Sequence, residues 1–183
     1  QTVSRSGASI DEMNLLQEIR QQGDLTLRVY GSLSVSADID EAAMAGLDQL
    51  RRQYPDDPTL KLGGVEIVCS CDSAKLARAV ALLDKHDWHV TVRAPNEAGV
   101  TAALDAFEYA ASVNAAPVRG RRHRLEHVEA IGKEDLARLS RLGVIAGPFQ
   151  SGVSPAAAPI WSALSDAGAR LLFGSNWPAS SLD

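Results

Sequence analysis

One polar residue stands where a short apolar segment passes into a loop near the end of the chain. Leu171, Leu172 and Phe173 precede the stretch "GSNWP", so we expect a buried strand with Asn176 at its carboxyl end. In parallel α/β folds, chemistry is carried out at that end of the sheet. The amide of Asn176 forms hydrogen bonds but does not titrate, which makes it an unusual choice for a catalyst.

Other side chains that could do chemistry also lie in or just after strand-like segments. Glu66 lies in "GVEIVCS", Arg93 in "WHVTVRA" and His127 in "HRLEHV". By its position alone, His127 is a core or rim histidine. Trp177 follows Asn176 in the last loop, where an aromatic ring could line a pocket.

The chain has two cysteines, Cys69 and Cys71, two residues apart in an extended segment. Their side chains would point to the same face, which is awkward for a mutual disulfide and insufficient alone for a metal site. They are interpreted as core or strand-end thiols, with a metal or redox role as the alternative. Such sparse cysteine fits a reducing compartment, and we expect a cytoplasmic protein.

Composition narrows the class of protein. A chain of 183 residues with 45% hydrophobic and 22% charged residues fits one ordinary globular domain, which we place over residues 1–183. The formal net charge of -5 disfavours a nucleic-acid partner, and the basic stretch "VRGRRHR" is interpreted as a solvated loop. No apolar run approaches the roughly 20 residues that span a bilayer, so no membrane is expected.

Short apolar segments alternate with amphipathic ones along the chain, which predicts parallel strands joined by helices. We expect about six strands, at residues 25–33, 64–70, 88–94, 123–128, 143–147 and 170–175. Helices are expected at residues 10–23, 72–87, 96–114, 132–143 and 156–168. Caps are predicted at Ser9, Asp72 or Ser73, and Asn96, and helix ends at Gly143 and Gly168.

The strand count separates two folds. A closed (β/α)8 barrel needs eight strands and about 250 residues, which is about two units more than this chain offers. An open doubly wound sheet fits the length, but the Gly-rich phosphate loop after its first strand is missing. We therefore predict an α/β fold in the form of a partial (β/α)8 barrel, with the open sheet as the alternative.

Four stretches in order carry a family resemblance: "LKLGGVEIV", "WHVTVRAPNEAGVTAALDAFE", "RHRLEHVEAI" and "LLFGSNWPASSLD". Together they resemble the amidohydrolase superfamily, in particular its amidohydrolase-3 branch of metal-dependent hydrolases. The resemblance implies a barrel with a divalent metal, usually zinc, at the carboxyl ends of the strands. It also implies hydrolysis of a C–N bond, in an amide or cyclic amide, by metal-activated water.

The resemblance also assigns site positions. His127 stands at a metal-ligand histidine, whereas Arg93 stands where the family has another histidine ligand and Glu66 where it has a lysine. Asn176 replaces the aspartate that binds metal and shuttles the proton. The family's first-strand His-x-His pair and its β-sandwich are not found in these residues.

These substitutions leave two functions open. Arginine cannot coordinate zinc, and a Glu66–Arg93 salt bridge in place of the metal is the simplest electrostatic consequence. Glu66 could still bind metal, and Arg93 and Trp177 could bind substrate. The chain is therefore either a hydrolase of a small molecule or a catalytically inactive relative that serves as a binding or assembly module.

A partial barrel leaves two strand edges exposed, which we expect at residues 25–33 and 171–175. Unpaired backbone groups on such edges invite pairing with another chain. We therefore expect either further chain segments or a second copy, forming a homodimer, to complete the barrel.

Overall fold

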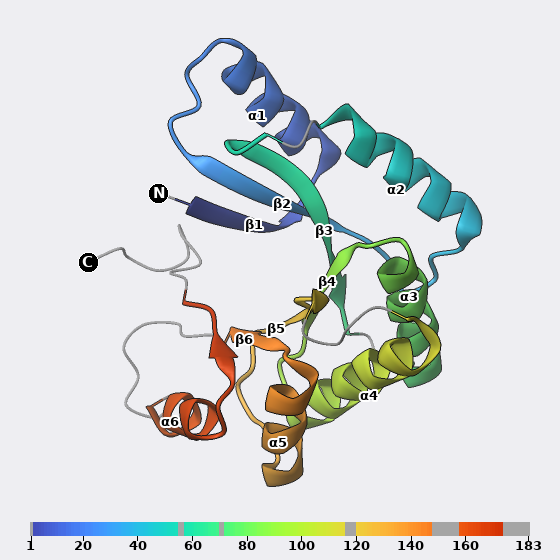
Figure 1. Ribbon diagram of the computed structural model, residues 1–183, viewed down its shortest axis with the longest axis vertical. Helices are drawn as coiled ribbons and strands as arrows, with labels where there is room; N and C mark the ends of the chain where they lie inside the picture. Colours follow the sequence, from blue (N-terminus) through green and yellow to red (C-terminus); the bar gives the residue numbers. More distant parts are fainter. Residues whose placement is uncertain (1, 55–56, 70–71, 116–119, 148–157, 174–183) are drawn as a thin grey trace.

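The computed structural model describes residues 2–54, 57–69, 72–115, 120–147 and 158–173, in which strands and helices alternate (Figure 1). The strands are β1 (Thr2–Ala8), β2 (Arg28–Ser34), β3 (Leu60–Val68), β4 (His89–Arg93), β5 (Arg124–Glu126), β6 (Ile145–Gly147) and β7 (Arg170–Leu171). The helices are α1 (Ile10–Gln21), α2 (Glu41–Gln53), α3 (Ser73–Lys85), α4 (Glu97–Val113), α5 (Lys133–Leu142) and α6 (Ala158–Asp166).

The strands form one curved parallel sheet in sequential order, from β1 to β7. One hydrogen bond shows that the sheet is curved: Ser6 Oγ on β1 donates to Glu126 Oε1 on β5 at 3.0 Å. Because β2, β3 and β4 lie between those strands, the two side chains meet only if the sheet bends round. Figure 1 shows this bend, with the helices on the outside. The fold is thus α/β and fits a partial (β/α)8 barrel, as predicted.

Helix ends follow the local signals in the sequence. Ser9 caps α1 in a capping box, since its Oγ accepts from the Glu12 backbone and the Glu12 carboxylate accepts from the Ser9 N–H. Asp72 and Asn96 cap α3 and α4 with a side-chain oxygen that accepts a hydrogen bond from a backbone N–H of the first turn. Gly143 ends α5 with a φ of 66°, the left-handed conformation that glycine adopts without strain. These caps were predicted at these positions.

Two elements were not predicted. Strand β1 reads "TVSRSGA", in which polar residues outnumber apolar ones, so no apolar run marks it. It brings the described strands to seven and pairs with β2, which also pairs with β3. The first edge of the sheet is therefore β1, and the expectation of an exposed edge at residues 25–33 is wrong. The sequence did not predict helix α2 because most of its residues are exposed, and Met44 is its one buried residue.

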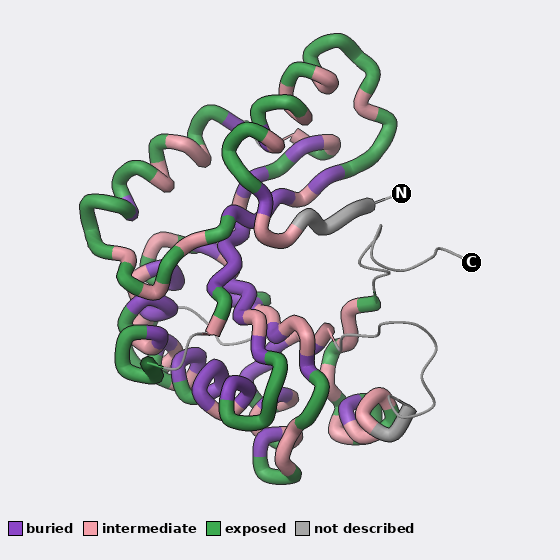
Figure 2. The backbone as a smooth tube through the Cα atoms, turned by 180° about the vertical axis from the view of Figure 1, so that it is seen from behind, coloured by how far each residue is buried: buried purple, intermediate pink, exposed green. Residues whose placement is uncertain are grey.

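The apolar core lies between the sheet and α3 and α4, which pack against each other. Figure 2 shows the buried stretches concentrated along the central strands and these helices. The largest buried apolar side chains there are those of Trp88, Phe107, Leu83, Leu104 and Leu125. In the part of the chain that the structure describes, no helix combines the length and apolarity needed to cross a membrane.

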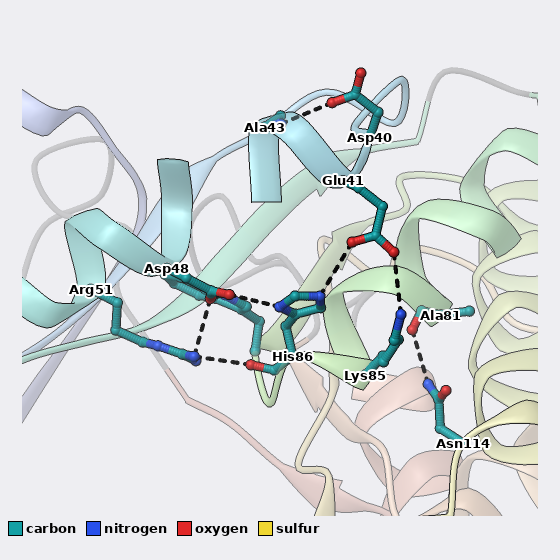
Figure 3. Close-up of polar contacts among 10 residues, drawn as sticks. Asp40, Glu41, Ala43, Asp48, Arg51, Ala81, Lys85, His86 and Asn114 are labelled. Atoms are coloured by element: carbon teal, nitrogen blue, oxygen red, sulfur yellow. Dashed lines mark hydrogen bonds and ion pairs between the residues drawn. The ribbon is translucent and has the colours of Figure 1, made fainter. Parts of the chain in front are cut away.

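Several polar contacts join helix α2 to the segment around the end of α3 (Figure 3). Asp48 accepts hydrogen bonds from Nε1 of Trp88 at 2.9 Å and from the His86 ring at 2.7 Å. Arg51 donates to the backbone carbonyls of His86 and Asp87 and lies 4.5 Å from the centre of the Trp88 ring. The role of His86 here is structural.

Candidate active site at the barrel mouth

The carboxyl ends of three neighbouring strands bring together the side chains that the sequence singled out. Glu66 lies two residues before the end of β3, Arg93 is the last residue of β4, and His127 directly follows β5. Register places Glu66 opposite Thr91 and Arg93 opposite Glu126. Glu66, Arg93 and His127 therefore lie at the carboxyl ends of adjacent strands.

Arg93 and Glu66 form an ion pair, with Nη2 of Arg93 2.9 Å from Oε1 of Glu66. The Glu66 side chain is only 3% exposed, whereas that of Arg93 is 39% exposed and reaches the mouth. A carboxylate buried to this degree needs a counter-charge, because its desolvation would otherwise be very costly. The salt bridge predicted from the sequence is present.

Strand β1 closes over the Glu66 carboxylate through a glycine. Gly7 has a φ of 65°, and a Cβ atom built there would lie 3.2 Å from Oε1 of Glu66. Any larger residue would therefore be strained and crowd the carboxylate. Sequence reasoning missed this contact because it requires knowing that β1 exists.

His127 reaches the mouth through an uncommon backbone conformation. Strand alternation places His123 and Leu125 on the helix-facing side of β5, and a regular continuation would place His127 there too. His127 instead has a φ of 60°, a left-handed conformation that costs a non-glycine residue about 1–2 kcal/mol. Burial, helped by the nearby charge of Arg93, lowers the pKa of His127. The imidazole is therefore neutral at pH 7.

Glu126 and Ser6 are site residues that the sequence did not reveal. The carboxylate of Glu126 lies on the inner face of β5, where it accepts the hydrogen bond from Ser6 across the barrel. The alternation in "HRLEH" is the available signal, since it places Arg124 and Glu126 on the face opposite His123 and Leu125.

His123 is packed on the outer side of the sheet. Its ring stacks on Phe107 of α4, with ring centres 5.0 Å apart, and Nε2 lies 3.1 Å from a carboxylate oxygen of Asp84. His127, with its left-handed φ, departs from the regular alternation of β5.

A second polar group occupies the inner face of the sheet nearer the amino ends of the strands. The Tyr30 hydroxyl and Nδ1 of His89 form a hydrogen bond of 2.7 Å, and the Arg124 guanidinium lies 5.8 Å from the centre of the Tyr30 ring. Burial raises the pKa of Tyr30 to about 12 and lowers that of His89 to about 4. Both groups are therefore neutral at pH 7, and the pair is structural.

Two of the predicted site residues, Asn176 and Trp177, lie outside the described residues, as does Cys71. Cys69 carries a free thiol and is partly buried after β3, in line with a strand-end thiol. Among the described residues, no group of three or more His, Cys, Asp and Glu side chains could hold a metal ion.

The described part of the mouth does not fit a divalent metal. His127 and Glu66 are the two candidate ligands, but the guanidinium of Arg93 lies against the Glu66 carboxylate and cannot donate a lone pair. A fixed positive charge at that place repels a second cation.

One hollow in the described part of the chain lies away from this mouth. It is a groove of about 600 Å³ between the start of α1 and α2. Its apolar lining includes Ile10, Val35, Ile39, Leu47 and Leu50. No candidate catalytic side chain lines it.

Solved structures with the same fold include hydrolases, at low sequence identity. The first is an uncharacterized metal-dependent hydrolase from Pyrococcus furiosus, with a TM-score of 0.72 and 18% identity over 99% of this chain and 43% of that one. An adenosine deaminase from Xanthomonas campestris with bound zinc has a TM-score of 0.63 and 17% identity over 98% of this chain and 43% of that one. A guanine deaminase from C. acetobutylicum with bound guanine has a TM-score of 0.63 and 12% identity, over 98% and 46%.

At these identities the likeness shows the fold, and the chain spans less than half the length of each structure. No curated protein matches the sequence. The model of the amidohydrolase family, by contrast, matches residues 2–183. The chain therefore belongs to the amidohydrolase family.

Proposed function

We propose that the chain is part of a hydrolase that cleaves a C–N bond in a polar small molecule, such as an amide or cyclic amide. The observation that carries this proposal is the meeting of Glu66, Arg93 and His127 at the carboxyl ends of three strands, in a chain of the amidohydrolase family. Two of the similar structures are named as deaminases, and a deaminase breaks a C–N bond.

Each residue has a proposed role in binding the reacting group. Arg93 donates hydrogen bonds to a carbonyl oxygen, which its partly exposed guanidinium can reach from the mouth. Neutral His127 accepts a hydrogen bond from the substrate. Asn176 and Trp177 are assigned by the family motif, Asn176 to hydrogen bonding at the family's acid-base position and Trp177 to the wall of the pocket.

A divalent metal, zinc above all, is suggested by the similar structures, one named as metal-dependent and one with bound zinc. The described residues do not fit a metal, so the proposed roles belong to the side chains alone. The sparse cysteine of the sequence supports a cytoplasmic location, and further chain segments or a second copy are proposed to complete the barrel.

A second function is favoured by one observation, the Arg93–Glu66 ion pair. The ion pair occupies two positions that the family resemblance assigns to the site. In addition, the amide of Asn176 cannot act as a base at neutral pH. Loss of a general base typically lowers a rate by about 10²–10⁴. The alternative is therefore a barrel that binds a small molecule without turning it over.

Hydrolysis by the purified natural protein separates the two functions. The substrates would be linear amides, cyclic amides and amino-substituted nitrogen heterocycles. We expect turnover that His127→Ala abolishes and that Lys133→Ala, an exposed change at the start of α5, leaves intact.

Thermal-shift measurements with the same compounds complete the test. Binding without turnover, lost in His127→Ala, would establish the binding module. Neither turnover nor binding across the panel would contradict both functions.

A further inference from the structure

The position of the Arg93 guanidinium is fixed by its ion pair with Glu66. Arg93 is the last residue of β4, and its Nη2 lies 2.9 Å from Oε1 of Glu66. Its Nε is buried and has no hydrogen-bond partner among the described residues. The guanidinium is thus fixed at this place by its charge on Glu66 more than by a full set of hydrogen bonds.

Glu66 has little freedom to leave this partner. It is 2% exposed, in the middle of the sheet between β2 and β4. Gly7 lies over the carboxylate, with a would-be Cβ 3.6 Å from Cδ of Glu66. An acidic side chain held this way needs a cation beside it at all times.

A guanidinium and a divalent cation satisfy a carboxylate in the same place, so they compete for it. The guanidinium carries a delocalised positive charge, so it acts as the counter-ion of the carboxylate without any bound metal. The charge of Arg93 also reaches His127, the second candidate ligand. The charge of Arg93 therefore opposes the binding of a cation near Glu66 and near His127.

We infer that Arg93 is a built-in cation that excludes divalent metal from this barrel mouth, because its guanidinium already neutralises the buried Glu66 carboxylate. The inference does not depend on the proposed hydrolysis, because it concerns the binding of a cation and not turnover.

The test is a titration with Co²⁺, whose visible absorption reports its ligands. The proteins are the wild type, Arg93→Gln, which removes the charge, and Arg93→Lys, which keeps it. We expect Arg93→Gln to bind Co²⁺ at least about tenfold more tightly than the wild type, since the repulsion of one charge at close range is worth at least that factor. Arg93→Lys should bind like the wild type.

The double variant Glu66→Gln with Arg93→Gln assigns the site. It should lose the gain in affinity, because it lacks the carboxylate ligand. Equal affinity of Arg93→Gln and the wild type would overturn the inference. Tight binding of Co²⁺ by the wild type, or a gain that survives Glu66→Gln, would overturn it as well.

Removing Arg93 leaves Glu66 as a buried lone charge, so Arg93→Gln could fail to fold without metal. Thermal unfolding with and without Co²⁺ then gives the answer. Stabilisation of Arg93→Gln by Co²⁺, with no shift for the wild type, supports the inference. An Arg93→Gln protein that stays unfolded in Co²⁺ while Arg93→Lys folds would refute it.

Discussion

Ser6 Oγ on the first strand donates a hydrogen bond to Glu126 Oε1 on the fifth, at 3.0 Å across the inner face of the sheet. This bond joins the two sides of a barrel that the described strands leave open. The loss of unfolding free energy when this bond is removed therefore reports how much the bond stabilises the curved sheet.

The variant Ser6→Ala should lower the free energy of unfolding by about 1–2 kcal/mol, because Glu126 is half-buried and loses a donor. Urea denaturation measures the change. The matched control is Ser34→Ala, at an exposed position on β2, which should stay within about 0.5 kcal/mol of the wild type. Equal effects of the two substitutions would show that the cross-barrel bond carries no stability.

Asp84 should govern part of the acid stability of the core. Burial acts to raise the pKa of Asp84, but hydrogen bonds from His123, Asn114 and Arg121 outweigh it and hold the pKa below its ordinary value. A depressed carboxyl pKa stabilises the fold fully above its unfolded value of about 3.9, and this stability is lost as the pH falls through the folded pKa. The wild type should therefore lose stability below about pH 4.

The variant Asp84→Asn should lack this acid-dependent part, and at pH 7 it should lose about 3 kcal/mol or more, since Arg121 is left as a buried unpaired charge. Urea midpoints across pH measure both effects. Asp24→Asn, at an exposed position after α1, is the control and should follow the wild type. A wild-type profile that is flat between pH 5 and pH 3 would rule out this role for Asp84.

The imidazole of His89 should stay neutral far below the usual range. Burial lowers the pKa of His89 to about 4, so the neutral form is favoured in the fold. Its contribution to stability is complete above the unfolded pKa of about 6.5 and is lost as the pH falls toward 4. NMR titration of the ring protons should show a midpoint near pH 4 for His89, and a midpoint near 6.5 would contradict the buried pair with Tyr30.

Helix α2 should detach when its polar anchor is removed. Burial acts to raise the pKa of Asp48, but hydrogen bonds from Trp88 and His86 lower it below its ordinary value, so the carboxylate is charged at neutral pH. Asp48→Ala removes the acceptor for both donors and should cost about 2 kcal/mol. Hydrogen exchange should then speed up across Glu41–Gln53 more than across α3.

The control for this experiment lies on the same helix. Gln49→Ala changes an exposed residue of α2 and should leave its exchange close to that of the wild type. Exchange that stays slow in Asp48→Ala would mean that apolar packing around Met44 is enough to hold α2.

The features that the sequence determined alone are those set by neighbouring residues. The caps at Ser9, Asp72 and Asn96, and the left-handed end at Gly143, depend on bonds within one turn of helix, so the residue types at those positions are enough. The alternation of apolar strands with helices likewise predicted the parallel sheet, and the family resemblance predicted its curvature into a partial barrel. The four ordered stretches that resemble the family indicated it, and the family model confirms it.

Only the tertiary structure decided which side chains meet. Strand β1 has no apolar run, and it exists because β2 offers it a partner, which then brings Ser6 to Glu126 and Gly7 to Glu66. The face that His127 presents is set by a left-handed φ that no local rule predicts for histidine. These contacts join residues far apart in the chain, and their energies appear only when the folded sheet closes the distance between them.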